Sequence, residues 1–319
     1  MRSRKTEINR FKKLQESEGR KMGISRNDIM DYYREPLPDK IPGAKLFNIA
    51  IQYEANGLTD EAIKVYTDAI NQGNLEAAIN LGVIFMYRTK IEICHAAGLF
   101  LYAASKGLSC GYRNLAQMYI KKILPGGNEM AAEYYLKAAN MGDARAQCNY
   151  AIMCKTGKGV KKNTAEAIIW IRKSAENGYY RAQAILGEMY HDGDGVYKDL
   201  DASVEWYVKA ADNGSPIAAY TLAMMFLEGK EVEKNEKFGR QMLDRAVELG
   251  YSKAAYEAGK IAESENDYVT AVMLYSEGAN KGEPRCIEKL CEMGYYERVD
   301  RINSVSLDSD YNIGEIKND

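Results

Sequence analysis

The chain has 319 residues, a net charge of −2 and an isoelectric point of about 6.0, so its overall charge gives no reason to expect binding to nucleic acid. No run of residues approaches the ~18 apolar positions that a membrane-spanning helix requires. The basic start, residues 1–5, is not followed by the apolar stretch of a signal peptide. These exclusions favour a cytoplasmic protein without a membrane span.

Residues 1–42 form a basic leader, with eleven lysines and arginines against seven acidic residues. Ser25 and Asp28 resemble a capping box before a short helix through Tyr33. The prolines that follow predict an extended linker, at Pro36, Pro38 and Pro42. Two interpretations stay open: a flexible leader whose helix covers the start of the folded region, or a basic arm that docks on membrane or nucleic acid. Acidic residues interrupt the basic ones throughout, which favours the first.

From residue 43 the chain repeats one pattern, which is clearest in residues 182–214. Ala182, Leu186 and Tyr190 recur at steps of four and therefore share one face of a helix. A second helix carries an equivalent stripe, made of Ala202, Trp206 and Ala210. Each copy of the pattern is thus predicted to be a pair of helices.

About seven copies are present, and their first helices carry the pairs Ile49-Ala50, Leu81-Gly82, Leu115-Ala116, Tyr150-Ala151, Leu186-Gly187, Leu222-Ala223 and Ala258-Gly259. A repeat near 36 residues is typical of a solenoid, because one helix pair cannot bury both of its faces and must stack on neighbours. Gly187 leaves room for another backbone to approach closely.

The ends of the helices are also marked. The loop at Gly193–Gly195 ends a first helix, because glycine adopts the left-handed conformation that a helix end needs. Polar residues placed to cap the second helices are Asn163, Asp199 and Asn235.

The full pattern, A-x-x-x-L-G-x-x-Y, then G-x-G-V, A-x-x-W, K-A-A and G, resembles the Sel-1-like repeat family, a relative of the tetratricopeptide repeat. The resemblance covers residues 44–283 and is most specific in residues 146–214, which hold Trp170, Trp206 and both G-x-G-V loops. In the outer copies the tryptophan position is assigned to Tyr66, Leu99, Tyr134, Met242 and Leu274. The resemblance implies an all-α, right-handed α/α superhelical solenoid with a concave groove, whose members are usually adaptors for protein partners.

The domain organisation predicted on this basis is a leader (1–42), a repeat solenoid (43–298) and an acidic, disordered tail (299–319). Pro284 suits the first turn of a capping helix. The residues expected to cover the last repeat are Ile287, Leu290, Cys291 and Tyr295. The tail could fold back on the groove as an internal ligand.

No catalytic or metal site is apparent. The six cysteines do not recur with the repeat, so we interpret them as reduced. His95 and His191 fall in different repeats. The Asp192–Asp194 loop starts like a calcium loop, but Val196 and Ser203 stand where oxygen ligands belong. Motifs of zinc proteases, P-loop proteins and serine hydrolases are absent, and the two tryptophans occupy equivalent packing positions. We therefore predict no cofactor and no metal.

The candidate binding residues lie on the first helices. The residue before the Leu-Gly position is asparagine in four successive copies: Asn48, Asn80, Asn114 and Asn149. In related peptide-binding tetratricopeptide proteins this position faces the groove, where an asparagine can donate to and accept from a ligand main chain. Basic residues nearby could receive acidic groups or a carboxylate: Arg113, Lys121, Arg145 and Arg181. The alternative is that these asparagines are solvated helix residues.

The leading hypothesis is a non-catalytic adaptor that binds a protein or extended peptide in the groove. A hydrolase of cell-wall or β-lactam substrates is the alternative by family analogy, and a regulator that reaches nucleic acid through the leader is a third. Homo-association through the ends of the array is also open.

Overall fold

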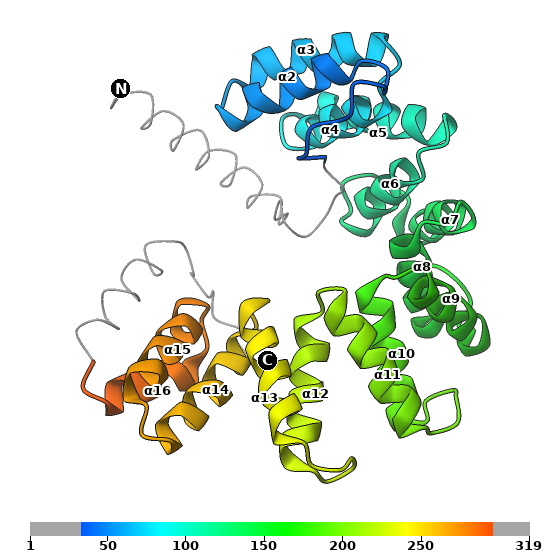
Figure 1. Ribbon diagram of the computed structural model, residues 1–319. Helices are drawn as coiled ribbons and strands as arrows, with labels where there is room; N and C mark the ends of the chain where they lie inside the picture. The colour runs from blue at the N-terminus through cyan, green and yellow to red at the C-terminus, as the bar shows by residue number, and fades with distance from the viewer. Residues whose placement is uncertain (1–32, 296–319) are drawn as a thin grey trace, which may run out of the picture. The chain divides into compact units, whose positions relative to one another are not determined.

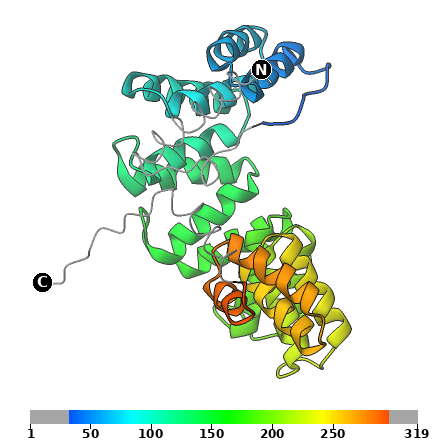
Figure 2. The ribbon, with the colours of Figure 1, turned by 90° about the vertical axis from the view of Figure 1, so that its left-hand side faces the viewer.

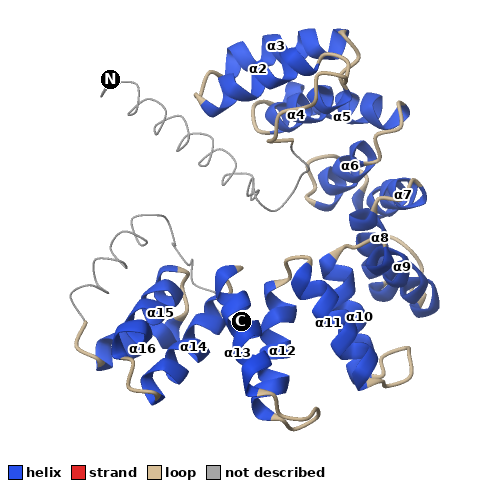
Figure 3. Ribbon diagram, in the orientation of Figure 1, coloured by secondary structure: helices blue, strands red, loops and turns tan. Residues whose placement is uncertain are grey.

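The computed structural model describes residues 33–295, and within that range every regular element is an α-helix (Figure 3). Fifteen helices, α2 to α16, are joined by short loops. The helices follow one another as pairs joined by a short loop, which confirms the all-α repeat fold. The helix predicted near Ser25 lies outside the described residues except at Tyr33, which is not helical as predicted because its main chain is hydrogen-bonded to Asn80. The predicted tail at 299–319 also lies outside them.

The contacts divide the chain into two compact units, and the first unit ends at Asn177. Its helices form four pairs, coloured blue to green in Figure 1. They are α2 (Ala44–Ala55), α3 (Thr59–Asn71), α4 (Leu75–Met86), α5 (Lys90–Ser105), α6 (Cys110–Ile120), α7 (Gly127–Asn140), α8 (Ala144–Thr156) and α9 (Thr164–Glu176).

The second unit begins at Gly178 and holds three pairs and a final single helix, coloured green to orange and seen from another side in Figure 2. Its helices are α10 (Tyr180–Asp192), α11 (Leu200–Asp212), α12 (Pro216–Glu228), α13 (Glu236–Glu248), α14 (Ser252–Ser264), α15 (Tyr268–Asn280) and α16 (Pro284–Glu292). Within each unit a helix packs mainly against the helices before and after it.

The predicted helix ends are confirmed. Asn163, Asp199 and Asn235 each accept a hydrogen bond from the backbone N–H three residues later, at Glu166, Ala202 and Phe238. Gly193 ends α10 in the left-handed conformation, with φ of 76°. A residue with a Cβ atom is disfavoured there, which explains why glycine recurs at this point.

Inside several pairs, a glycine of the first helix lies against an aromatic ring of the second. A Cβ atom at Gly82 would come within 2.6 Å of the Phe100 ring, and one at Gly187 within 3.0 Å of the Tyr207 ring. Gly187 therefore makes room for a side chain and not for a second backbone.

The assignment of Tyr66 to the tryptophan position is wrong by one residue. Tyr66 precedes Gly73 by seven positions, as Tyr207 precedes Gly214. Both rings are buried, whereas Trp206 and its true counterpart Val65 are only partly covered. Because both positions lie on the side of the helix that packs inward, the apolar pattern alone did not separate them.

The last helix, α16, covers the final pair with Cys286 and Leu290, which are fully buried against α15. Ile287 and Cys291 contact the same cluster at its edge. Tyr295 does not contribute as predicted, because α16 ends at Glu292 and the Tyr295 side chain is 40% exposed.

Candidate peptide-binding site

Two asparagines of the first unit hold the main chain of residues 33–42, the segment that we call the strap. Asn80 on α4 accepts from the Tyr33 N–H (2.9 Å) and donates to the Tyr33 carbonyl oxygen (2.8 Å). Asn48 on α2 does the same to Leu37, at 2.7 Å and 2.9 Å. Each carboxamide thus recognises one complete residue of an extended chain, independently of its side chain.

The strap has a fixed register and direction. The two residues that are held, Tyr33 and Leu37, are four positions apart, one for each helix pair. The chain runs from α4 toward α2, opposite to the order of the repeats, before it enters α2 at Ala44. An extended chain covers about 13 Å in four residues. The strap therefore passes from one first helix to the next within four residues.

Prolines and a third asparagine shape the strap. Pro36 and Pro38 flank Leu37 and restrict it and its neighbours to extended conformations. Asn74, which is buried, donates to the Pro42 carbonyl oxygen at 2.8 Å and also accepts from the Ala77 N–H at the start of α4. The same residue therefore starts one repeat and secures the strap over another.

The orientation of the Asn80 carboxamide is fixed by a hydrogen-bond chain. Its amide nitrogen also donates to the Tyr66 hydroxyl (3.1 Å), which donates in turn to Glu54 (2.8 Å). Since Tyr66 uses its proton on Glu54, it must accept from Asn80, which leaves the Asn80 oxygen for a main-chain N–H. Burial and the nearby Glu54 carboxylate raise the pKa of Tyr66 well above its usual range, so the hydroxyl stays protonated and the arrangement persists.

The other two asparagines of the row lie at the same position on α6 and α8. Asn114 is fully buried, whereas Asn149 is half-buried. Within residues 33–295 the Asn149 side chain makes no hydrogen bond. The row of four therefore includes two members that hold the strap and one, Asn149, that has no partner in the described chain.

The basic candidates are not gathered around this row. Arg113 is buried, and its Nε lies 2.9 Å from both carboxylate oxygens of Asp143. Burial lowers the pKa of Arg113, although Asp143 opposes that effect. Lys121 lies at the end of α6, and Arg145 and Arg181 are exposed near the starts of α8 and α10. Arg181 belongs to the second unit and the other three to the first.

Sequence reasoning missed four residues of this site: Tyr33, Leu37, Asn74 and Asp143. Tyr33 and Leu37 had a signal, because they are apolar and lie four residues apart in a proline-rich linker. No local sequence pattern marked Asp143, since its ion pair with Arg113 joins positions 30 residues apart.

The two histidines sit in other surroundings. His191, at the end of α10, contacts Asp192 through Nδ1 and Glu231 through Nε2, both at 2.5 Å. His95 lies beside the Phe85 ring. Among the described residues, neither histidine is hydrogen-bonded to a serine or cysteine, and no three His, Cys, Asp or Glu side chains gather as a metal site would require. No helix between residues 33 and 295 is long and apolar enough to cross a membrane.

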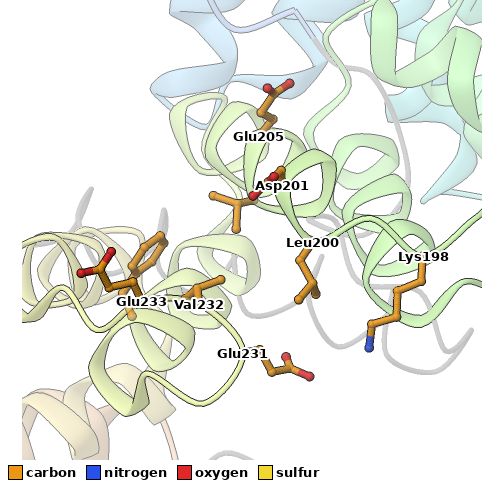
Figure 4. A pocket seen from close by; sticks show the side chains of 9 residues that line it. Lys198, Leu200, Asp201, Glu205, Glu231, Val232 and Glu233 are labelled. Atoms are coloured by element: carbon orange, nitrogen blue, oxygen red, sulfur yellow. The ribbon is translucent and has the colours of Figure 1, made fainter.

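An open depression of about 870 Å³ lies in the second unit, between the start of α11 and the α12–α13 loop (Figure 4). It is lined by the apolar side chains of Leu200 and Val232 together with the carboxylates of Asp201, Glu205 and Glu233. None of the eight candidate residues lines it.

The family model of the Sel1 repeat matches this chain five times in succession, at residues 112–143, 144–179, 181–215, 216–251 and 252–283. The chain belongs to the Sel1 repeat family. The matches begin at the third helix pair, so the first two pairs of this Sel1 repeat protein, which hold the strap, have the same helical form without a match of their own. Sel1 repeats commonly serve as scaffolds for protein interactions.

Two solved Sel1 repeat structures resemble the chain. A Sel1 repeat protein from Oxalobacter formigenes is 25% identical, with a TM-score of 0.66, over 79% of this chain and 76% of the other. A protective antigen of uropathogenic Escherichia coli strains with an SLR fold is 24% identical, with a TM-score of 0.57, over 79% of this chain. The match spans 57% of that antigen. No curated protein sequence matches this Sel1 repeat protein.

Proposed function

We propose that this Sel1 repeat protein is a non-catalytic adaptor that binds an extended segment of a protein partner along its asparagine row: Asn48, Asn80, Asn114 and Asn149. The observation that carries the proposal is the hold of Asn48 and Asn80 on the strap. Both atoms of each carboxamide engage one residue of an extended main chain. This is the chemistry that an adaptor needs in order to bind a segment through its backbone.

The asparagines act from a rigid base. They project from helices that pack against their neighbours in the array, and the Tyr66–Glu54 chain already orients Asn80. A ligand therefore loses conformational freedom on binding while the scaffold loses little. The carboxamides of Asn48 and Asn80 each make two main-chain hydrogen bonds to the strap, and such a pair of bonds contributes on the order of 1–3 kcal/mol.

Asn149 is the residue to test first. Its side chain makes no hydrogen bond within the described residues, so Asn149→Ala leaves the internal structure intact. Thr221→Ala is the matched control, because Thr221 holds the same repeat position on α12 and bonds only to the Ile217 carbonyl of its own helix. The measurement is the affinity for a partner captured on the wild-type full chain, determined for both variants.

We expect Asn149→Ala to weaken the partner about tenfold, which corresponds to ~1.4 kcal/mol, and Thr221→Ala to leave the affinity unchanged. Equal affinities for all three proteins would contradict binding along the asparagine row. Of the basic candidates, Lys121 and Arg145 are proposed to flank the same partner segment, whereas Arg113 is paired with Asp143 and Arg181 belongs to the second unit. The six cysteines carry free thiols, which supports a reducing compartment such as the cytoplasm.

A further inference from the structure

The strap shows which side chains the asparagine row accepts. Tyr33 and Leu37 are half-buried, while the residues between and beside them, Arg34, Glu35, Pro36 and Pro38, are exposed. Within residues 33–38, only the two residues whose main chain is held also rest their side chains on the helices; Ile41, in the turn before α2, is half-buried as well. Specificity at this site therefore falls on two positions, four residues apart.

Both side chains rest on the hydrophobic core of the first unit. Tyr33 contacts the clusters built around Phe47 and Phe100, and its hydroxyl lies 3.6 Å from the Cys110 sulfur. Leu37 contacts the first of these clusters. Burial raises the pKa of the Cys110 thiol to about 11, so the thiol faces Tyr33 as a neutral, weakly polar group. An aromatic side chain with a polar tip fits the Tyr33 position, and an aliphatic side chain fits the Leu37 position.

We propose that the partner segment is an extended peptide with an aromatic residue followed four positions later by leucine, and that the strap occupies its site as a tethered competitor. The inference rests on the proposed function, since it assigns the ligand of the same asparagine row. The partner enters in the direction of the strap, from α4 toward α2, so that each asparagine meets one residue of the four-residue register.

The strap can compete with a partner peptide for the asparagine row, in addition to covering the first helix pairs. It belongs to no helix pair, and its main chain is held by five hydrogen bonds from three asparagine side chains. Its tether to α2 gives it an effective concentration in the millimolar range. A peptide in solution must compete with that concentration. Its apparent affinity is the intrinsic affinity multiplied by the fraction of molecules whose site is open.

The test uses the full chain and a synthetic probe of residues 33–42, acetylated at its start and labelled at its end for fluorescence anisotropy. The receptors are the wild type and the Tyr33→Ala/Leu37→Ala variant, whose own strap lacks both anchors. The control probe is N-methylated at its leucine, which removes the N–H that Asn48 accepts. We expect the variant to bind the probe at least tenfold more tightly than the wild type, and the control probe to lose at least tenfold in affinity.

Equal affinity of both receptors for the probe, or no binding by either, would overturn the inference. Circular dichroism melts check that the double variant is folded, and Leu37→Ala alone replaces it if it is not, with the same expected direction. The proposed function is tested separately at Asn149, which does not hold the strap. A partner that depends on Asn149 while the probe fails would reject the tethered competitor and leave the adaptor in place.

Discussion

At the scale of single residues, one side chain often serves two neighbouring repeats. Asp143 accepts from the Ala146 N–H at the start of α8 (2.8 Å) and also pairs with Arg113 on α6. Arg113 is 8% exposed, so this ion pair is largely shielded from water. Removing the carboxylate from a buried ion pair costs more than the pair itself contributes, because the remaining charge is poorly solvated.

Asp143→Asn should therefore destabilise the protein by about 3 kcal/mol, because asparagine still caps α8 but removes the carboxylate charge that faces the buried Arg113. Asp143→Ala should cost about 1 kcal/mol more, since the cap is lost as well. Asp199→Ala, which removes a cap without an ion pair, is the control and should cost only about 1 kcal/mol. Urea unfolding of the four proteins measures these differences; a cost for Asp143→Asn as small as the control's would show that the pair contributes little.

The asparagine row illustrates how far a sequence determines a site. Residue type and repeat spacing singled out the four asparagines, and Asn48 and Asn80 do hold main-chain groups, because such a preference follows from chemistry local to each helix. The occupant of Asn48 and Asn80 was not predicted. Tyr33 lies 47 residues from Asn80, and which segment reaches an amide depends on tertiary packing that no local pattern records. The same holds for Arg113, whose partner Asp143 lies in the next repeat.

At the scale of elements, the fit between the two helices of a pair depends on glycine. Gly82 on α4 faces the Phe100 ring, where an added Cβ would lie 2.6 Å from a ring carbon. Gly98 on α5 belongs to the same pair but is exposed, and a Cβ there would meet no atom within 4 Å. An added methyl group would therefore clash at Gly82 and meet open space at Gly98.

Gly82→Ala should destabilise the protein by about 1–3 kcal/mol, because the ring has to move away from its packed position. Gly98→Ala should stabilise it by roughly 0.5–1 kcal/mol, because alanine loses less chain entropy in a helix than glycine does. Thermal melting of both variants gives the signs. A Gly82→Ala protein as stable as the wild type would mean that the pair adapts without cost.

A histidine links the end of α10 to the α12–α13 loop of the second unit. His191 at the end of α10 joins Asp192 beside it to Glu231 in the α12–α13 loop. Hydrogen bonds to Asp192 and then to Glu231 raise the pKa of His191 above its ordinary value, while partial burial opposes them. The charged imidazole thus holds the α12–α13 loop to the end of α10.

Because the folded-state pKa is the higher one, the stabilisation is fully present below the unfolded pKa of about 6.5. It is lost as the pH rises through the raised folded-state value. The melting temperature of the wild type should therefore exceed that of His191→Gln most between pH 5.5 and 6.5, and the two should converge at alkaline pH. A difference that grows with pH would contradict the sign of the shift.

At the scale of the whole molecule, the described chain is a series of neighbours. Helices pack mainly on the preceding and following helix, and the contacts separate into two units between Asn177 and Gly178. The sequence predicted the helix pairs and their caps, since glycine, cap and apolar positions recur in each copy. It did not predict this division, because the repeat runs through residues 144–215 without a change of pattern.

Stability in such a chain is approximately a sum of terms from single repeats and from adjacent ones. A strained glycine in one unit should therefore loosen that unit alone. We expect Gly82→Ala to raise amide hydrogen exchange in helices α2–α9 and leave α10–α16 unchanged. Gly259→Ala, whose Cβ would lie 2.5 Å from the Tyr275 ring, should do the reverse. Exchange measured on the two full-length variants compares both units at once, because local opening free energies differ from one cooperative unit to another. If either substitution raised exchange equally in both units, the chain would open as a single cooperative structure, and the division of contacts at Asn177 would have no energetic counterpart.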